Sequence, residues 1–241
     1  MAREFLGERG VDFESLDIGE ERARARWLDA GSPPVPALVA GPRVVSLIAP
    51  RAQIAAELGL PGDPALDAAS LLWDLVSLHE AWTALLGPLS WSVLTMPTPS
   101  RGRTPLELAV NVFHGLRRTI EAWPTGRFDW ATDDDAREAA EAELLARLHS
   151  PDALARYLAE RSAAWREFAL EVGDGAADLE RTVADPLGSR VAFRDILESQ
   201  RLHAAVHLRQ ITHALDAAAI PHGSSSALER LRGLRLPEQP F

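Results

Sequence analysis

Two histidines four residues apart are the strongest candidates for chemistry in this sequence. His203 and His207 lie in residues 195–216, which contain no proline or glycine, so we expect one long helix there. On a helix, residues at i and i+4 lie above one another with Cβ atoms about 6 Å apart, and Gln210 falls on the same face. Two imidazoles held in this way can bind one divalent metal ion. The same spacing also arises by coincidence on exposed helix faces, so a pair of surface histidines is the alternative.

The composition limits the classes of function. The chain has 241 residues, 46 % of them hydrophobic, which is enough for one large domain or two small ones. Its net charge is −10 and it has no basic block, so we do not expect nucleic acid as a partner. No apolar run approaches the roughly 20 residues of a membrane-spanning helix and no signal-peptide pattern is present, so we expect a cytoplasmic protein without a membrane partner. The absence of cysteine excludes a disulfide, a zinc–thiolate site and a cysteine nucleophile.

Residues 1–60 mix short helical and extended patterns. Residues 2–9, 20–30 and 52–58 read as helices, and residues 11–18 alternate like a strand. Residues 37–40 and 43–47, separated by Gly41-Pro42, predict a β-hairpin. Residues 61–64 read as a linker, because they combine two prolines and a glycine.

This order of elements resembles a glutaredoxin-like thioredoxin fold. The residues that carry the resemblance are Arg3-Glu4-Phe5-Leu6 followed by Gly10-Val11-Asp12-Phe13, which look like the family's first helix running into its second strand. Val35-Pro36 stands where such proteins have a cis-proline beside the thiol site, which implies that Pro36 lies near a bound thiol. The family's first strand and Cys-x-x-Cys turn are missing, so thiol–disulfide chemistry by this segment is excluded.

The missing strand leaves three alternatives open. The two remaining pieces of sheet close up, another chain covers the gap, or Met1 is an internal methionine of a longer gene product. We expect the last, because unpaired backbone groups on two strands are costly if those edges are buried. A structural remnant that packs against the rest of the chain is the simplest role for the segment.

The remaining residues predict a mainly α fold. Amphipathic helical patterns cover residues 67–86, 104–122, 150–172 and 195–216, and residues 133–148 read as an acidic helix. Residues 90–103 and 174–193 look like connections and residues 123–126 like a turn. Thr104 followed by Pro105 and Glu107 is a helix start with a capping box. Four long helices with connections too long for hairpins predict a four-helix bundle with a crossover over residues 64–220, followed by a tail at 221–241.

A four-helix bundle whose last helix carries His203-x-x-x-His207-x-Arg209-Gln210-Ile211 resembles the DinB/YfiT-like family. The resemblance implies a divalent metal, Zn²⁺ or Ni²⁺, held by two residues of the last helix and one of the second helix. It also implies a thiol-dependent transferase or isomerase that uses mycothiol, bacillithiol or glutathione. Arg209 and Gln210 would then orient an anionic substrate or a metal-bound water, with a structural salt bridge or hydrogen bond as the alternative.

The sequence departs from the family at the third ligand. The family's second helix typically begins Thr-x-x-Asp/Glu-Leu-x-x-His, and here that register starts at Thr104 and places Asn111 at the ligand position. His114 lies almost one turn later, about 60° around the helix, from where a different rotamer could reach the same point. We therefore expect His114, His203 and His207 as metal ligands, with Asn111 among the residues that contact substrate. The alternative is a partly buried His114 beside a metal site that has decayed.

The sequence is compatible with three functions. The first is a metal-dependent thiol S-transferase or isomerase acting on an electrophilic small molecule, in which the metal binds the thiol as thiolate. The second is a non-catalytic binding or stress-response protein that keeps the bundle but has a degenerate metal site. The third, an oligomeric scaffold, predicts a stable homodimer without thiol dependence.

Overall fold

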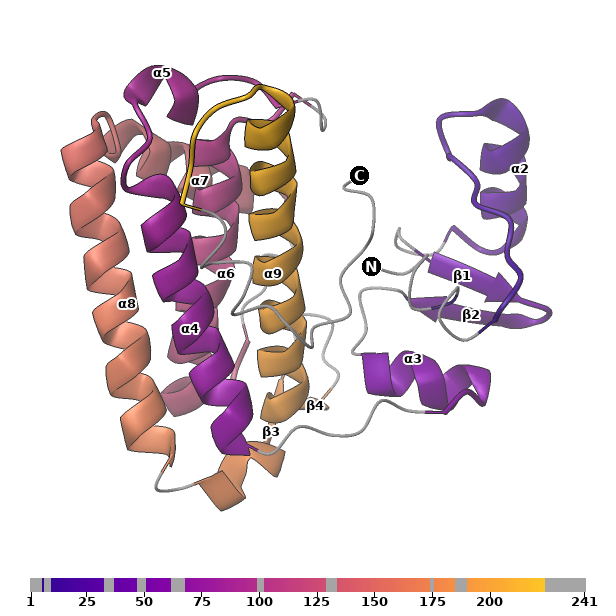
Figure 1. Ribbon diagram of the computed structural model, residues 1–241. Coiled ribbons are helices and arrows are strands. Elements are labelled where there is room, and N and C mark those ends of the chain that lie inside the picture. Colours follow the sequence, from indigo (N-terminus) through magenta and orange to yellow (C-terminus); the bar gives the residue numbers. More distant parts are fainter. Residues whose placement is uncertain are drawn as a thin grey trace. The chain divides into compact units, whose positions relative to one another are not determined.

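The computed structural model describes residue 6 and residues 10–32, 37–46, 51–61, 68–98, 102–128, 134–173, 176–184 and 190–223. The chain divides into two compact units, Met1–Ala65 and Leu66–Phe241. Most of the described residues are helical, and the strands among them form two short hairpins (Figure 1). The expected mainly α class is therefore confirmed.

Among its described residues the first unit has the helix α2 (Glu21–Asp29), the hairpin of β1 (Ala37–Ala40) and β2 (Arg43–Ser46), and the helix α3 (Arg51–Leu58). The strands are antiparallel, and Ala40 pairs with Arg43 across a two-residue turn. Gly41 in this turn has a φ of 61°, which glycine adopts without strain. A small apolar cluster packs beneath the hairpin and consists of Leu6, Val45, Ile54 and Ala55. The predicted hairpin and the two predicted helices are thus present.

Residues 11–17 do not form a strand, and the prediction made from their alternation is wrong. A strand needs a neighbour for its backbone groups, and within the described residues β1 pairs with β2 alone. Asp17 instead closes a turn before α2, because its Oδ1 accepts a hydrogen bond from the backbone N–H of Gly19 at 2.9 Å. Pro36 and, apart from Leu6, the helix expected over residues 2–9 lie outside the described residues.

Four long helices surround one hydrophobic core in the second unit (Figure 1). They are α4 (Ala68–Leu86), α6 (Pro105–Thr125), α8 (Pro151–Gly173) and α9 (Phe193–Ala217). α4 packs most extensively against α8 and α9, and α6 packs against α9, α8 and the additional helix α7 (Asp134–Arg147). Each of these five helices lies within a few residues of its predicted bounds.

The connections contain more regular structure than their sequences indicate. The short helix α5 (Trp91–Leu94) lies between α4 and α6, in a stretch expected to be a loop. A 3₁₀ turn, η1 (Ala176–Glu180), and an antiparallel hairpin of β3 (Thr182–Ala184) and β4 (Arg190–Ala192) join α8 to α9. α9 follows β4 directly.

Local signals set both ends of α6. Thr104 Oγ1 accepts a hydrogen bond from the Glu107 backbone N–H at 3.1 Å, and Glu107 Oε2 accepts from the Thr104 backbone N–H at 2.7 Å. Pro105 suits the first helical position, where its missing N–H has no partner to lose. The helix continues through residues 123–125, which were expected to form a turn, and ends at Gly126 with a φ of 65°.

Aromatic side chains connect the helices through the core. The ring of Phe113 on α6 lies edge-to-face to His79 and Trp82 of α4, with ring centroids 5.1 and 6.0 Å apart. His79 is fully buried (0 % exposed), and its ring lies 5.2 Å from that of Trp165 on α8. The indole Nε1–H of Trp82 donates to the Ala204 carbonyl oxygen at 3.1 Å and so joins α4 to α9. Each fully buried large side chain contributes about 1.5–3 kcal/mol, so this core holds α6 and α9 in a defined arrangement.

Candidate metal centre

His203 and His207 lie side by side on α9. Their ring centroids are 4.6 Å apart, and the ring planes make an angle of 77° in a T-shaped arrangement. The helix imposes this proximity, because residues four apart share one face. Both side chains are partly buried. The two rings are therefore neighbours on one face of α9.

The surroundings of His203 favour its neutral form. Burial, together with the positive charges of His207 and Arg103, lowers the pKa of His203 to about 3. A neutral imidazole keeps the nitrogen lone pair that a metal ion requires. At neutral pH the ring needs no deprotonation before it can bind a metal.

Gln210 determines the tautomer of His207. His207 Nδ1 lies 2.7 Å from Gln210 Oε1. Because an amide oxygen only accepts, Nδ1 carries the hydrogen and donates it, which leaves the lone pair on Nε2. A metal-binding histidine is commonly held in this way by a hydrogen bond from its other ring nitrogen. Gln210 can support His207 in this way because it lies on the same face of α9 as the two histidines.

The two candidate third ligands of α6 have partners of their own. His114 is buried (7 % exposed), and its Nε2 accepts a hydrogen bond from Arg118 Nε at 3.3 Å. The Nδ2 amide group of Asn111 donates to Glu141 Oε1 of α7 at 3.1 Å. His114 therefore does not direct an unengaged Nε2 toward the histidine pair.

The described residues contain no group of three or more histidine, cysteine, aspartate or glutamate side chains that could hold a metal ion. The structure brings His203, His207 and Gln210 together and does not join His114 to them in one such group. The three-histidine ligand set stays a prediction. The two adjacent imidazoles of His203 and His207 are donors of the type that a divalent metal ion binds.

α6 and α9 approach each other closely beside this pair. A Cβ atom on Gly115 of α6 would lie 2.6 Å from Oε1 of Gln200 on α9, so a larger residue here requires the Gln200 amide to shift. Gln200 is itself buried, and its Oε1 finds no hydrogen-bond partner among the described residues. Gln200 lies three residues before His203, and this spacing is the signal by which the sequence could have revealed it.

Of the remaining predicted site residues, Arg209 lies away from the face of α9 that carries the histidine pair. Arg209 follows His207 by two residues, which places it about 160° away around the helix. Pro36 lies outside the described residues. Sequence reasoning also missed Arg118 and Glu141. Arg118 lies four residues after His114 and could have been found from that spacing, whereas nothing in the sequence relates Glu141 to Asn111.

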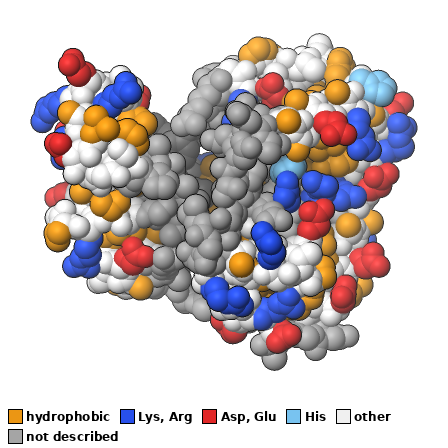
Figure 2. All heavy atoms as spheres, turned by 180° about the vertical axis from the view of Figure 1, so that it is seen from behind, with side chains coloured by type: hydrophobic (Ala, Val, Ile, Leu, Met, Phe, Trp, Pro, Cys, Tyr) orange, Lys and Arg blue, Asp and Glu red, His pale blue; other side chains and the backbone are white. Residues whose placement is uncertain are grey.

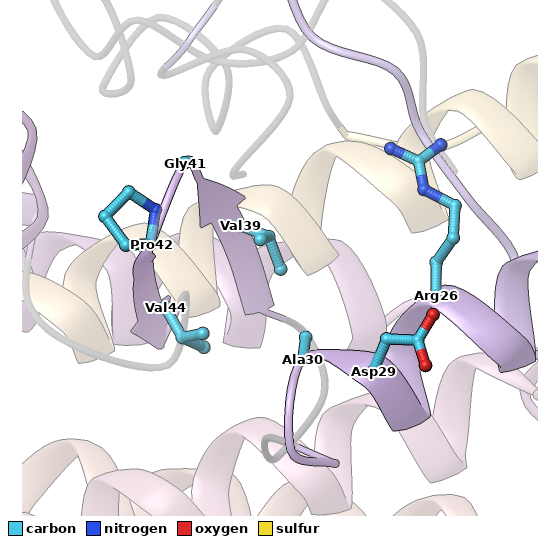
Figure 3. A pocket seen from close by; sticks show the side chains of 7 residues that line it. All are labelled: Arg26, Asp29, Ala30, Val39, Gly41, Pro42 and Val44. Carbon is cyan, nitrogen blue, oxygen red and sulfur yellow. The ribbon is translucent and has the colours of Figure 1, made fainter.

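The first unit has an open depression of about 450 Å³, formed by the end of α2 and the hairpin (Figure 3). Its lining residues are Arg26, Asp29, Ala30, Val39, Gly41, Pro42 and Val44. Figure 3 shows the side chains of Val39 and Val44 on the hairpin. It also shows one basic residue, Arg26, and one acidic residue, Asp29, on α2. No histidine lines it, and it offers no ligand set for a metal.

Comparison of the chain with protein-family models, with curated proteins and with solved structures finds no match. In the part of the chain that the structure describes, no helix combines the length and the apolar character that crossing a membrane requires. On the face of the second unit visible in Figure 2, acidic and basic side chains are intermixed. The histidine pair on α9 and its neighbours are therefore the candidate functional site.

Proposed function

We propose that the second unit is a DinB-like four-helix bundle that binds Zn²⁺ or Ni²⁺ through His203, His207 and a donor from α6. Its activity is the transfer of a low-molecular-weight thiol (mycothiol, bacillithiol or glutathione) to an electrophilic small molecule, or a thiol-dependent isomerisation. The observation that carries this proposal is the pair of rings 4.6 Å apart on one helix. The neutral state of His203 and the hydrogen bond from His207 to Gln210 support it further.

Each residue of the proposed site has a separate role. His203 and His207 hold the ion, and Gln210 keeps His207 in the tautomer that binds through Nε2. A divalent ion at this position supplies a Lewis acid that lowers the pKa of a bound thiol. Arg103 adds positive charge near His203, which favours an anionic sulfur. In the transfer, a bond forms between sulfur and carbon, the leaving group departs with its bonding electrons, and the thiol proton passes to water.

The test uses the full chain loaded with Zn²⁺ or Ni²⁺. Monochlorobimane is added with each of the three thiols, and the fluorescent conjugate is followed together with the bound metal. His203→Ala should lose both metal and conjugation. His213→Ala is the matched control, because His213 is an exposed histidine of the same helix, and this variant should keep both. Unchanged metal stoichiometry in His203→Ala would reject the site.

The second candidate function is a non-catalytic binding or stress-response protein with a degenerate metal site. It is favoured by the engagement of His114 with Arg118 and of Asn111 with Glu141. Under this function the wild-type chain gives only background conjugation with every thiol, whether or not it binds metal. The conjugation assay therefore separates the two.

For the first unit the proposal includes an incomplete thioredoxin-like segment. The β1–β2 hairpin and the contact of α3 with β2 support it. A crystal structure that resolves residues 1–50 tests it. A strand pairing with β1 on its open edge would support the assignment, and an isolated hairpin would contradict it.

A further inference from the structure

The relative direction of α6 and α9 follows from one close approach between the helices and one electrostatic interaction. Gly115 of α6 meets Gln200 of α9. Arg103, which precedes α6 by two residues, acts electrostatically on His203. In a parallel arrangement, His203 would lie past Gly115 on the side away from Arg103. The two residues would then be about 20 Å apart along the helix axes, at a rise of 1.5 Å per residue, which is too far for this interaction. The helices are therefore antiparallel.

This register places Asn111 level with the histidine pair. Asn111 lies about 6 Å from Gly115 along the axis of α6, toward its first turn. On α9, His203 and His207 lie about 4.5 and 10.5 Å beyond Gln200 in the same direction. Asn111 is thus opposite the interval between the two histidines.

Helical geometry also orients Asn111 toward α9. Asn111 precedes Gly115 by four residues and so shares the face of α6 that meets α9. His203 and His207 follow Gln200 by three and seven residues and share the face of α9 that meets α6. His114 lies about 100° from Gly115 around α6, and its Nε2 is engaged by Arg118.

The hydrogen bond to Glu141 fixes which end of the amide is available. Asn111 Nδ2 donates to Glu141 Oε1 at 3.1 Å, so the Nδ2 end of the amide faces α7. The carbonyl Oδ1 diverges from Nδ2 at the same planar amide carbon, so it is directed away from the Glu141 carboxylate. An amide nitrogen does not bind metal ions, whereas an amide oxygen does.

We infer that Asn111 Oδ1, rather than His114, is the third metal donor, and that Glu141 is the positioning residue that directs it. This inference rests on the proposed function of His203 and His207. The site then spans α6, α7 and α9 and combines two imidazole nitrogens with one amide oxygen. None of these three donors carries a negative charge, so the remaining coordination positions accommodate an anionic ligand such as a thiolate.

The test is calorimetric titration of the purified, metal-free full chain with Zn²⁺, with Co²⁺ titrated in parallel and its visible absorption recorded. Glu141→Ala should weaken binding by about tenfold, the lower end of what loss of a supporting partner typically costs. Glu141→Gln keeps an oxygen acceptor for Asn111 Nδ2 and should retain affinity. Asn111→Ala should lose at least as much as Glu141→Ala and change the Co²⁺ spectrum, whereas His114→Ala should change neither.

One variant gains rather than loses affinity, so poor folding cannot imitate its result. Asn111→His should bind Zn²⁺ more tightly than wild type, because Glu141 can accept the N–H of the new imidazole. Unfolding curves of every variant identify losses due to misfolding. If neither Asn111→Ala nor Asn111→His changes the affinity, or if His114→Ala abolishes binding, the inference is overturned. If His203→Ala leaves binding unchanged, the proposed function itself fails.

Discussion

The Nδ1–H of His207 donates to Gln210 Oε1 at 2.7 Å, within one turn of the same helix. This contact predicts that Gln210 contributes to metal affinity without binding the ion. Gln210→Leu should weaken Zn²⁺ binding by about tenfold, since the ring loses the partner that orients it. Gln210→Glu keeps an acceptor at the same place and should bind at least as tightly as wild type. Equal calorimetric affinities for Gln210→Leu and wild type would contradict this role.

His79 predicts a loss of stability in acid. Burial lowers the pKa of His79 from 6.5 to about 4, only partly offset by its hydrogen bond to the Leu75 carbonyl. Between pH 6.5 and pH 4, His79 is therefore more protonated in the unfolded chain than in the folded protein. The free energy of unfolding has its full value above pH 6.5 and falls as the pH drops toward 4. The depression corresponds to about 3 kcal/mol.

Urea unfolding of wild type and His79→Phe between pH 7.5 and 4.5 measures this effect. The phenylalanine ring suits the space between Phe113 and Trp165 and does not titrate. The difference between the two proteins at pH 7.5 gives the change in packing. Below pH 6.5, wild type should lose more stability than the variant, and parallel curves would exclude His79 as the source.

The hydrogen bond from Trp82 to Ala204 predicts that a tryptophan-to-phenylalanine substitution lowers the free energy of unfolding more at position 82 of α4 than at position 73. Trp82→Phe removes the donor and leaves the Ala204 carbonyl without this partner, which should cost about 1–3 kcal/mol. Trp73 is 45 % exposed, and Trp73→Phe should change the unfolding free energy by no more than about 0.5 kcal/mol. Equal effects in chemical denaturation would show that the cross-helix bond contributes little.

Gly115 predicts a steric conflict that a second substitution relieves. Gly115→Ala places a methyl group against Gln200 Oε1 and should destabilise the bundle by about 1 kcal/mol, the low end for overpacking, because the end of the glutamine side chain can shift. Adding Gln200→Ala should recover most of that loss, because the conflicting atom is gone. A Cβ atom on Gly173 of α8 would meet nothing within 4 Å, so Gly173→Ala is the control and should not destabilise. Thermal unfolding of wild type and these variants completes the comparison.

Features that depend on neighbours in the sequence were predicted well. The start of α6 follows from Thr104, Pro105 and Glu107, whose capping interactions involve residues three apart. The proximity of His203 and His207 follows from helical geometry over four residues. The strand expected at residues 11–18 was wrong, because alternation alone does not supply the partner that a strand needs.

What the sequence by itself determined is therefore the set of helices and which residues share a face on each of them. Only the tertiary structure decided that Gly115 meets Gln200 and that Asn111 donates to Glu141, whereas the contact of Arg118 with His114 Nε2 lies within one turn of α6. The first two of these contacts join different helices, and their register is set by the packing of the buried aromatic core. Helical periodicity defines faces within a helix, whereas the alignment of one helix against another depends on the side-chain packing of the whole bundle.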